Sequence, residues 1–289
     1  MNFAIPYVDL PEIVLVRAGG WGASSPPLSL KPFAILVASG VYLGALCATR
    51  YGQRRGIPAR VLASFVVYVV SSGFVFAHVL DVLCYSPERV AVDPYALLRL
   101  WDGLSSFGGF IGGAAGALLW RFRYGVPVLP YADVVASALP LGWVFGRAGC
   151  AVAHDHPGLA SSAWFAVAYP GGGRLDLGLL ELAFTLPIAA AFLLMQRRAW
   201  PWGFFLGVLC TAYAPLRFGL DFLRLRETVL LPSTQLLAER RYGALTPAQW
   251  ACLVLGVLGA TLLRRSLVSS DQDAAFAAPS PPQAFKGGA

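Results

Sequence analysis

The sequence predicts an all-α integral membrane protein with seven transmembrane helices. Of its 289 residues, 57% are hydrophobic and only 13% are charged, whereas a soluble domain carries about 25% charged residues. The apolar residues form runs near the roughly 20 residues that a spanning helix needs. Arginine clusters follow alternate runs, which is the positive-inside pattern of membrane proteins.

The seven expected spans lie, in chain order, at residues 30–49, 61–83, 104–120, 130–152, 177–196, 202–223 and 247–263. The arginine clusters follow the first, third, fifth and seventh: Arg50, Arg54, Arg55 and Arg60, then Arg121 and Arg123, then Arg197 and Arg198, then Arg264 and Arg265. If these clusters are cytoplasmic, the N-terminus is periplasmic and the C-terminus cytoplasmic. We therefore expect a multi-pass protein of the bacterial inner membrane. The net charge of +7 then reports topology and not a nucleic-acid partner.

Residues 1–29 are expected to form a periplasmic or interfacial segment before the transmembrane domain, residues 30–263. Within that segment, the apolar stretch Ile13–Val16 suggests an amphipathic helix lying in the interface. The longer outer loops indicate a small periplasmic head. Residues 264–289, rich in Ala, Pro, Ser and Gln, are expected to be a disordered cytoplasmic tail.

Charged side chains inside spans are costly, so each is a functional hypothesis. In the sixth span, Tyr213, Arg217, Asp221 and Arg224 are spaced four, four and three apart and share one helical face. Asp221 is placed to neutralise Arg217 one turn away. A guanidinium donates two parallel hydrogen bonds and therefore suits a phosphate. The alternative is an ion pair that only holds helices together.

The end of the fourth span reads GRAGCAVAHDHPG, residues 146–158. Arg147 lies one to two turns inside the outer boundary of the span. His154, Asp155 and His156 follow at the water interface, where a histidine beside a carboxylate can take a proton near neutral pH. Cys150 and His154 are one turn apart, but a complete ligand set is not evident, so no metal site is assigned and no cofactor is expected.

Three further features concern other spans. Ser105 and Ser106 begin the third span and are candidates to line a polar cavity. The glycine pairs behind them, Gly109 with Gly113 and Gly112 with Gly116, favour tight helix packing. Glu181 in the fifth span needs a partner, for which Arg147 or Arg217 is the natural choice. His78 and Asp81 in the second span indicate a helix-stabilising pair.

These motifs, in this order, resemble the prolipoprotein diacylglyceryl transferase family. GRAGCAVAHDHPG is similar to the family signature, and DGLSSFGGFIGG to its glycine-rich third-span motif. RLDLGLLE is similar to its QLYE segment, and YAPLRFGLDFLR to its sixth-span helix. The resemblance covers about residues 30–263 and marks a divergent member.

The resemblance implies a reaction and its partners. The family transfers the diacylglyceryl group of the membrane lipid phosphatidylglycerol to the lipobox cysteine thiol of a prelipoprotein, releasing glycerol phosphate. The residues matched to the family's sites are Arg147, Asp155, Gly158, Glu181, Tyr213, Arg217, Asp221 and Arg224.

This chain also departs from the family pattern. Phe107 stands where the family has a histidine, Cys150 where it has an asparagine, and Phe33 in place of a tyrosine. His154 or His156 is the candidate to supply the missing base. The alternatives are a paralogue that binds lipid or prelipoprotein without turnover, and a lipid transporter or flippase.

Overall fold

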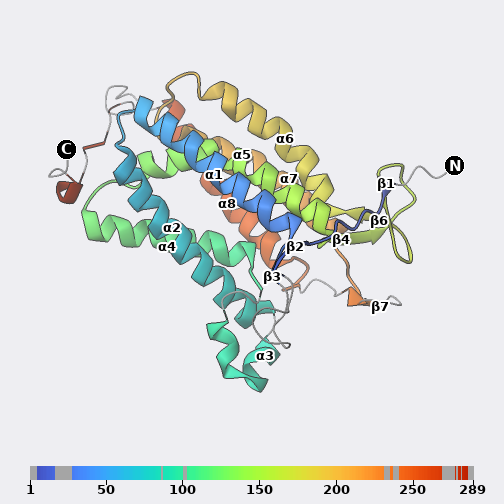
Figure 1. The fold of residues 1–289 in the computed structure, drawn as a ribbon. Helices are drawn as coiled ribbons and strands as arrows, with labels where there is room; N and C mark the ends of the chain where they lie inside the picture. Colours follow the sequence, from blue (N-terminus) through green and yellow to red (C-terminus); the bar gives the residue numbers. More distant parts are fainter. Residues whose placement is uncertain are drawn as a thin grey trace. The chain divides into compact units, whose positions relative to one another are not determined.

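The protein is described by a computed structural model (Figure 1). In its described residues there are seven long α-helices, one short α-helix and eight short β-strands. The described residues are 5–16, 28–85, 87–99, 103–230, 235–236, 241–268, 277, 279–280 and 282–285. The long helices are α1 (Pro32–Arg54), α2 (Ala59–Leu80), α4 (Ser106–Tyr124), α5 (Leu129–Ala153), α6 (Leu177–Met195), α7 (Phe204–Leu220) and α8 (Pro247–Val268). Each expected span therefore corresponds to one helix.

Six helical segments in the described part of the chain are long and apolar enough to cross a membrane. They are α1, α2 extended to Cys84, α5, α6, α7 extended to Leu223, and α8. The protein is thus an α-helical, multi-pass membrane protein. The remaining long helix, α4, falls below this measure because five glycines contribute little hydropathy and Arg121 and Arg123 lie in its last turn.

The chain forms two compact units. The first comprises Met1–Leu46, Ala138–Met195 and Gly219–Glu239, and the second comprises Cys47–Ser137, Gln196–Phe218 and Arg240–Ala289. The unit boundaries cut through α1, α5 and α7, so each unit contains part of all three helices.

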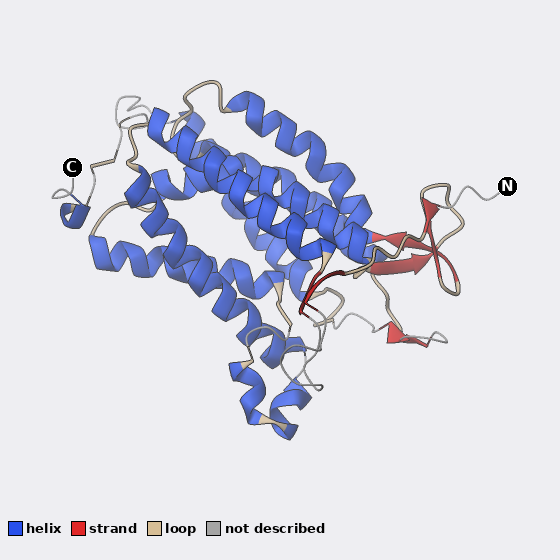
Figure 2. Ribbon diagram, viewed as in Figure 1, coloured by secondary structure: helices blue, strands red, loops and turns tan. Residues whose placement is uncertain are grey.

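A four-stranded sheet belongs to the first unit and lies at one end of α5 and α6 (Figure 2). Its strand order is β1 (Ile5–Pro6), β5 (Val167–Tyr169), β6 (Gly172–Asp176) and β4 (Pro157–Ala160). β1 pairs with β5 in parallel, Ile5 opposite Val167, while β6 is antiparallel to both β5 and β4. The sheet makes the protein less purely α-helical than the sequence predicts. That it forms the expected periplasmic head stays a prediction.

The prediction of an interfacial helix at Ile13–Val16 is wrong. These residues form strand β2, which pairs antiparallel with β3 (Leu28–Leu30). Ile, Val and Leu in an uninterrupted run suit an extended strand as well as a helix face. The partner strand, 12 or more residues away along the chain, decides between them. A second short hairpin joins β7 (Val229–Leu230) to β8 (Gln235–Leu236).

In the second unit, α2 and α4 lie side by side along their length (Figure 1). A Cβ atom added to Gly112 would lie 2.4 Å from the Ser72 carbonyl oxygen, and one on Gly116 would lie 2.3 Å from that of Tyr68. The tight helix packing expected at Gly112 and Gly116 is therefore present, since only glycine allows the α2 backbone to approach α4 this closely. Gly113, of the other expected pair, faces α2 at an ordinary distance.

The second unit continues beyond α2 through a π-helical turn (Asp81–Tyr85), α3 (Pro87–Val92) and a 3-10 turn (Pro94–Leu98). His78 anchors this excursion. Its buried ring places Nδ1 3.1 Å from the Gly103 carbonyl oxygen and Nε2 3.0 Å from that of Ala96. The role of His78 is thus to hold the loop that leads into α4, and it does not depend on the expected pairing with Asp81.

The boundary expected at residue 264 lies within a helix, because α8 runs to Val268. A 3-10 turn covers Gln283–Phe285. The rest of the expected disordered tail lies mostly outside the described residues.

Candidate functional site

Two predicted site residues of the first unit, Arg147 and Glu181, are buried and lie in contact with each other. Nε of Arg147 on α5 lies 3.0 Å from Oε1 of Glu181 on α6, and their side chains are 10% and 4% exposed. The expected pairing of Glu181 with Arg147 is therefore confirmed. The contact uses Nε, while Nη1 lies 3.8 Å from Cys150 Sγ. Each Nη of a guanidinium carries two protons, so the group retains donors that suit a phosphate.

The polar residues after Arg147 are brought back toward it by a sharp turn. α5 ends at Ala153, and His154 has φ +50, the positive φ of a left-handed residue. Such a conformation is uncommon for residues other than glycine, although Asn, Asp and His adopt it more often than the rest. It reverses the chain so that Asp155 and His156 lie beside Cys150, with one potential ligand atom from each of the three within 4.8 Å of one another.

The two histidines of the signature have different surroundings. His156 Nδ1 lies 3.2 Å from Asp155 Oδ1, and both side chains are about one-third exposed, at 30% and 39%. The His154 side chain is only 9% exposed and is directed toward Asp176, with Nδ1 donating to Asp176 Oδ2 at 2.8 Å. His154 is therefore held in place, while His156 is open to solvent.

Asp176 is a central residue that the sequence analysis missed. Its Oδ2 accepts from His154 and, at 2.8 Å, from the Tyr169 hydroxyl. Its Oδ1 accepts from the Leu179 backbone N–H at 2.9 Å, so Asp176 also caps the N-terminus of α6. The available signal was an aspartate directly before an apolar helical run.

Aromatic rings enclose the buried His154. Tyr7 stacks on it with ring centroids 4.2 Å apart, and Tyr169 lies edge-on at 5.5 Å. Burial, followed by the charge of the neighbouring Asp176, raises the pKa of the Tyr169 phenol. Tyr169 therefore remains a hydrogen-bond donor to this carboxylate over the ordinary pH range.

Gly158 allows two chain segments to meet closely. A Cβ atom here would lie 2.8 Å from the Leu223 carbonyl oxygen and 2.9 Å from that of Leu175. Gly158 forms a bridge with Arg224 and accepts from Arg174 Nη1 at 3.3 Å. Its position fits a requirement for backbone approach, separate from the substrate contact predicted for it.

The sixth-span set is divided between the two units. Asp221 is fully buried, and its Oδ1 accepts from Arg224 Nε at 2.7 Å. Tyr213 and Arg217 are buried on α7 in the second unit, at 9% and 6% exposure. The neutralisation of Arg217 by Asp221 stays a prediction, and the structure adds Arg224 as a close partner of that carboxylate.

The remaining predicted site residues begin α4. Ser105 is buried and caps the helix, its Oγ accepting from the Gly108 backbone N–H at 3.3 Å. The side chains of Ser106 and Phe107 lie outside the described part of the structure. In the first unit, Phe33 lies against α5, because a Cβ atom on Gly149 would lie 2.9 Å from its ring.

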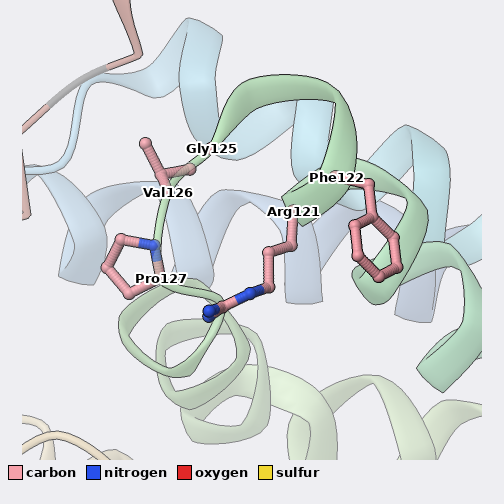
Figure 3. A pocket seen from close by; sticks show the side chains of 5 residues that line it. All are labelled: Arg121, Phe122, Gly125, Val126 and Pro127. Atoms are coloured by element: carbon pink, nitrogen blue, oxygen red, sulfur yellow. The ribbon is translucent and has the colours of Figure 1, made fainter.

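A pocket of about 400 Å³ lies at the far end of α4. Arg121 and Phe122 from the helix line it together with Gly125, Val126 and Pro127 from the loop that follows (Figure 3). None of the predicted site residues lines this pocket.

The fold and site define a polytopic membrane protein with a buried arginine–glutamate pair between α5 and α6 and a small sheet in the same unit. Residues 23–265 match the family described as prolipoprotein diacylglyceryl transferase. The chain belongs to this family, whose members are transferases.

Individual relatives carry the same description. The chain is 26% identical over 237 residues to a phosphatidylglycerol–prolipoprotein diacylglyceryl transferase of Agrobacterium fabrum, covering 76% of this chain and 81% of the relative. It is 25% identical to one of Symbiobacterium thermophilum, covering 85% and 93%, and 30% identical to one of Chromohalobacter salexigens, covering 68% and 78%. These low identities fit a divergent member.

Proposed function

We propose that this protein transfers the diacylglyceryl group of phosphatidylglycerol to the lipobox cysteine thiol of prelipoproteins. The reaction forms a thioether and releases glycerol phosphate. The substrates are those in the names of the relatives. The observation that carries the proposal is the burial of Arg147 beside Glu181 at the end of a membrane helix, at the position of the family's signature arginine.

Arg147 is assigned to the phosphate of the lipid. Negative charge grows on the departing glycerol phosphate as the thiolate attacks the glyceryl carbon, and a fixed guanidinium stabilises that charge. Glu181 orients the guanidinium through Nε. Arg217 receives the same role from the family pattern, with Tyr213, Asp221, Ser105, Ser106 and Gly158 as further lipid-binding candidates.

The acceptor thiol must lose its proton, because a free thiol with a pKa near 8.5 is only slightly ionised at neutral pH. Phe107 does not supply a base. Of the two candidate histidines, His156 is the better placed, since it is part exposed and paired with Asp155. His154, tied to Asp176, acts as a positioning residue.

We infer seven crossings, with the sheet on the periplasmic side and α4 as the third crossing. Two points on the same side of a membrane are separated by an even number of crossings. Three contacts support this count: β1 with β5, the Tyr242 hydroxyl donating to the Cys84 carbonyl oxygen at 2.7 Å, and Arg55 Nη1 donating to that of Trp200 at 2.8 Å. In each pair, the two contacting segments are separated along the chain by α4 and three of the apolar helices. The number of crossings between them is therefore even only if α4 also crosses the membrane.

This topology is tested by single cysteines in a cysteine-free background. Impermeant maleimide should label a cysteine at Gly171, between β5 and β6, in intact spheroplasts. A cysteine at Val126, after α4, should react only after lysis. Labelling of both positions from the same side contradicts the seven-crossing count.

The transferase activity is tested with purified protein, phosphatidylglycerol and a lipobox peptide. Wild type should form the thioether, and Arg147→Ala and Arg217→Ala should lower kcat/KM by two or more orders of magnitude, the scale of losing a preorganised donor. Arg198→Ala, outside the predicted site, is the control. Turnover by Arg147→Ala at the wild-type rate would remove the basis of the proposal.

The replacement of the family's histidine by Phe107 favours one second candidate, a paralogue that binds lipid or prelipoprotein without turnover. Complementation separates the two. A catalytically competent chain restores growth to cells depleted of their own transferase, whereas a binding paralogue does not.

A further inference from the structure

We propose that Cys150, Asp155 and His156 form a zinc site that binds and activates the acceptor thiol. The proposal rests on the proposed transferase function for its chemical purpose, although zinc binding is measured independently of activity. It begins from the geometry at the end of α5, where one donor atom from each residue lies within 4.8 Å of the other two.

The donor set has the chemistry of a catalytic zinc centre. Thiolate sulfur, imidazole nitrogen and carboxylate oxygen are the three ligand types that Zn²⁺ takes in proteins. Catalytic sites use three protein ligands and leave the fourth position of the tetrahedron for water or substrate. At zinc–ligand bonds of about 2.0–2.3 Å, neighbouring ligand atoms lie about 3.5 Å apart. Rotation of the part-exposed Asp155 and His156 side chains covers the remaining difference, while Cys150 stays fixed and buried.

The turn at His154 is what assembles the set. Its left-handed backbone brings residues 155 and 156 back to the last turn of α5. Its own side chain is directed to Asp176 and braced by Tyr7 and Tyr169. The metal pairing of Cys150 with His154, considered from their spacing, is thus replaced by one in which His154 holds the turn and its two successors supply the ligands.

The local charges also fit. A thiolate and a carboxylate together neutralise Zn²⁺, so the occupied site carries no net charge, which lowers the cost of burial. Arg147 Nη1 lies 3.8 Å from Cys150 Sγ. Glu181 at 3.0 Å balances the guanidinium charge so that it does not oppose the metal.

The fourth position gives the site a use. A thiol that coordinates zinc is deprotonated outright, so the prelipoprotein cysteine would bind there as a thiolate, releasing its proton to water. The sulfur lone pair then forms the new bond to the glyceryl carbon. The carbon–oxygen bond to the phosphate breaks, and its electron pair leaves with the glycerol phosphate beside Arg147. Zinc would thereby supply the thiol activation that a base at position 107 does not, and His156 would take part as a ligand of the metal in place of the free base assigned to it above.

The test is zinc binding by the full-length chain in detergent. Metal-free wild type should take up one zinc ion per chain by isothermal titration calorimetry and elemental analysis. Cobalt(II) should give the intense near-ultraviolet band of a thiolate ligand. Cys150→Ser should abolish the cobalt–thiolate band, and His156→Ala should weaken zinc binding at least tenfold, as loss of a ligand exceeds the roughly 10–100-fold effect of losing an outer partner. Cys210→Ala, a buried cysteine on α7, is the matched control and should behave as wild type.

Absence of a thiolate band in wild type, or an unchanged band in Cys150→Ser, overturns the zinc site. Transferase activity that survives complete chelation also overturns it, while leaving the transferase proposal intact. Conversely, stoichiometric zinc bound through Cys150 in a chain without transferase activity supports the site and counts against the proposed function.

Discussion

Arg147 and Glu181 form a buried ion pair that joins α5 to α6, with Nε and Oε1 3.0 Å apart. Removing one member of such a pair leaves the other charge buried without compensation, whereas removing both is often nearly neutral. We expect Glu181→Ala to lower the free energy of unfolding by about 3–5 kcal/mol. The double variant Arg147→Met/Glu181→Leu should lose less than either single variant. A double-mutant cycle in detergent, with unfolding followed by circular dichroism, measures this, and additive losses would contradict the coupling.

Asp176 connects the turn at His154 to the start of α6, and its variants should separate two roles. Asp176→Asn keeps an oxygen to cap the helix but loses the charge that accepts from His154 and Tyr169. Asp176→Ala loses the cap as well, which costs about a further 1 kcal/mol. We therefore expect the melting temperature to fall from wild type to Asp176→Asn and to fall further in Asp176→Ala. Equal melting temperatures for the two variants would show that the cap contributes nothing.

Tyr169 gives a pH dependence of known sign. Its pKa in the folded protein is raised from the usual 10.0 by burial and then by Asp176. Above pH 10 the unfolded chain releases this proton and the folded chain keeps it, so ionisation favours unfolding. The contribution of Tyr169 to stability should be complete below pH 10 and be lost as pH rises through and above it. Tyr169→Phe should make the stability profile between pH 9 and about 11 flatter than that of wild type.

The contact between α2 and α4 is set by individual glycines on α4. An alanine Cβ at Gly112 would lie 2.4 Å from the Ser72 carbonyl oxygen, while one at Gly113 would meet Val69 Cγ1 at 3.5 Å. Gly112→Ala should destabilise the protein by about 1–3 kcal/mol through overpacking. Gly113→Ala is the matched control on the same helix turn and should be close to wild type or slightly more stable, because alanine favours helix. Indistinguishable melting temperatures would refute the close approach.

His78 is the buried anchor of the excursion between α2 and α4. Both of its ring nitrogens face carbonyl oxygens, of Gly103 and of Ala96. The ring lies between the two carbonyls and is their side-chain partner. His78→Phe should remove this partner and loosen residues 87–99 and 103–105. Limited proteolysis measures this as faster cleavage in that segment, and an unchanged cleavage pattern would contradict the anchoring role.

The helices were predictable because their signal is local. The spans expected at residues 130–152 and 177–196 correspond to the helices Leu129–Ala153 and Leu177–Met195. In hydrocarbon, a single apolar run of spanning length can satisfy its backbone hydrogen bonds only as a helix. The pairing of Glu181 with Arg147 was foreseeable for a related reason. A carboxylate inside a span needs a cation, and few are available.

What escaped prediction depends on contacts between distant segments or on one residue's backbone conformation. Ile13–Val16 became a strand because Leu28–Leu30 pairs with it. The approach of Asp155 and His156 to Cys150 depends on the positive φ of His154, which residue type alone does not indicate. Asp176 was overlooked since only the fold places it between His154 and Tyr169.

The parallel pairing of β1 with β5 has a consequence for biogenesis. Ile5 and Pro6 emerge from the ribosome before α1, yet their partners Val167 and Ala168 follow α5. The first strand must therefore wait, unpaired, while the helices between them are made and inserted. Because β5 is synthesised only after α5, the pairing of β1 with β5 can form only late in synthesis. Once formed, the pairing ties Ile5 and Pro6 to the strand that contains Tyr169, one of the residues around His154. This tie can form only after the helices between the two strands have been synthesised.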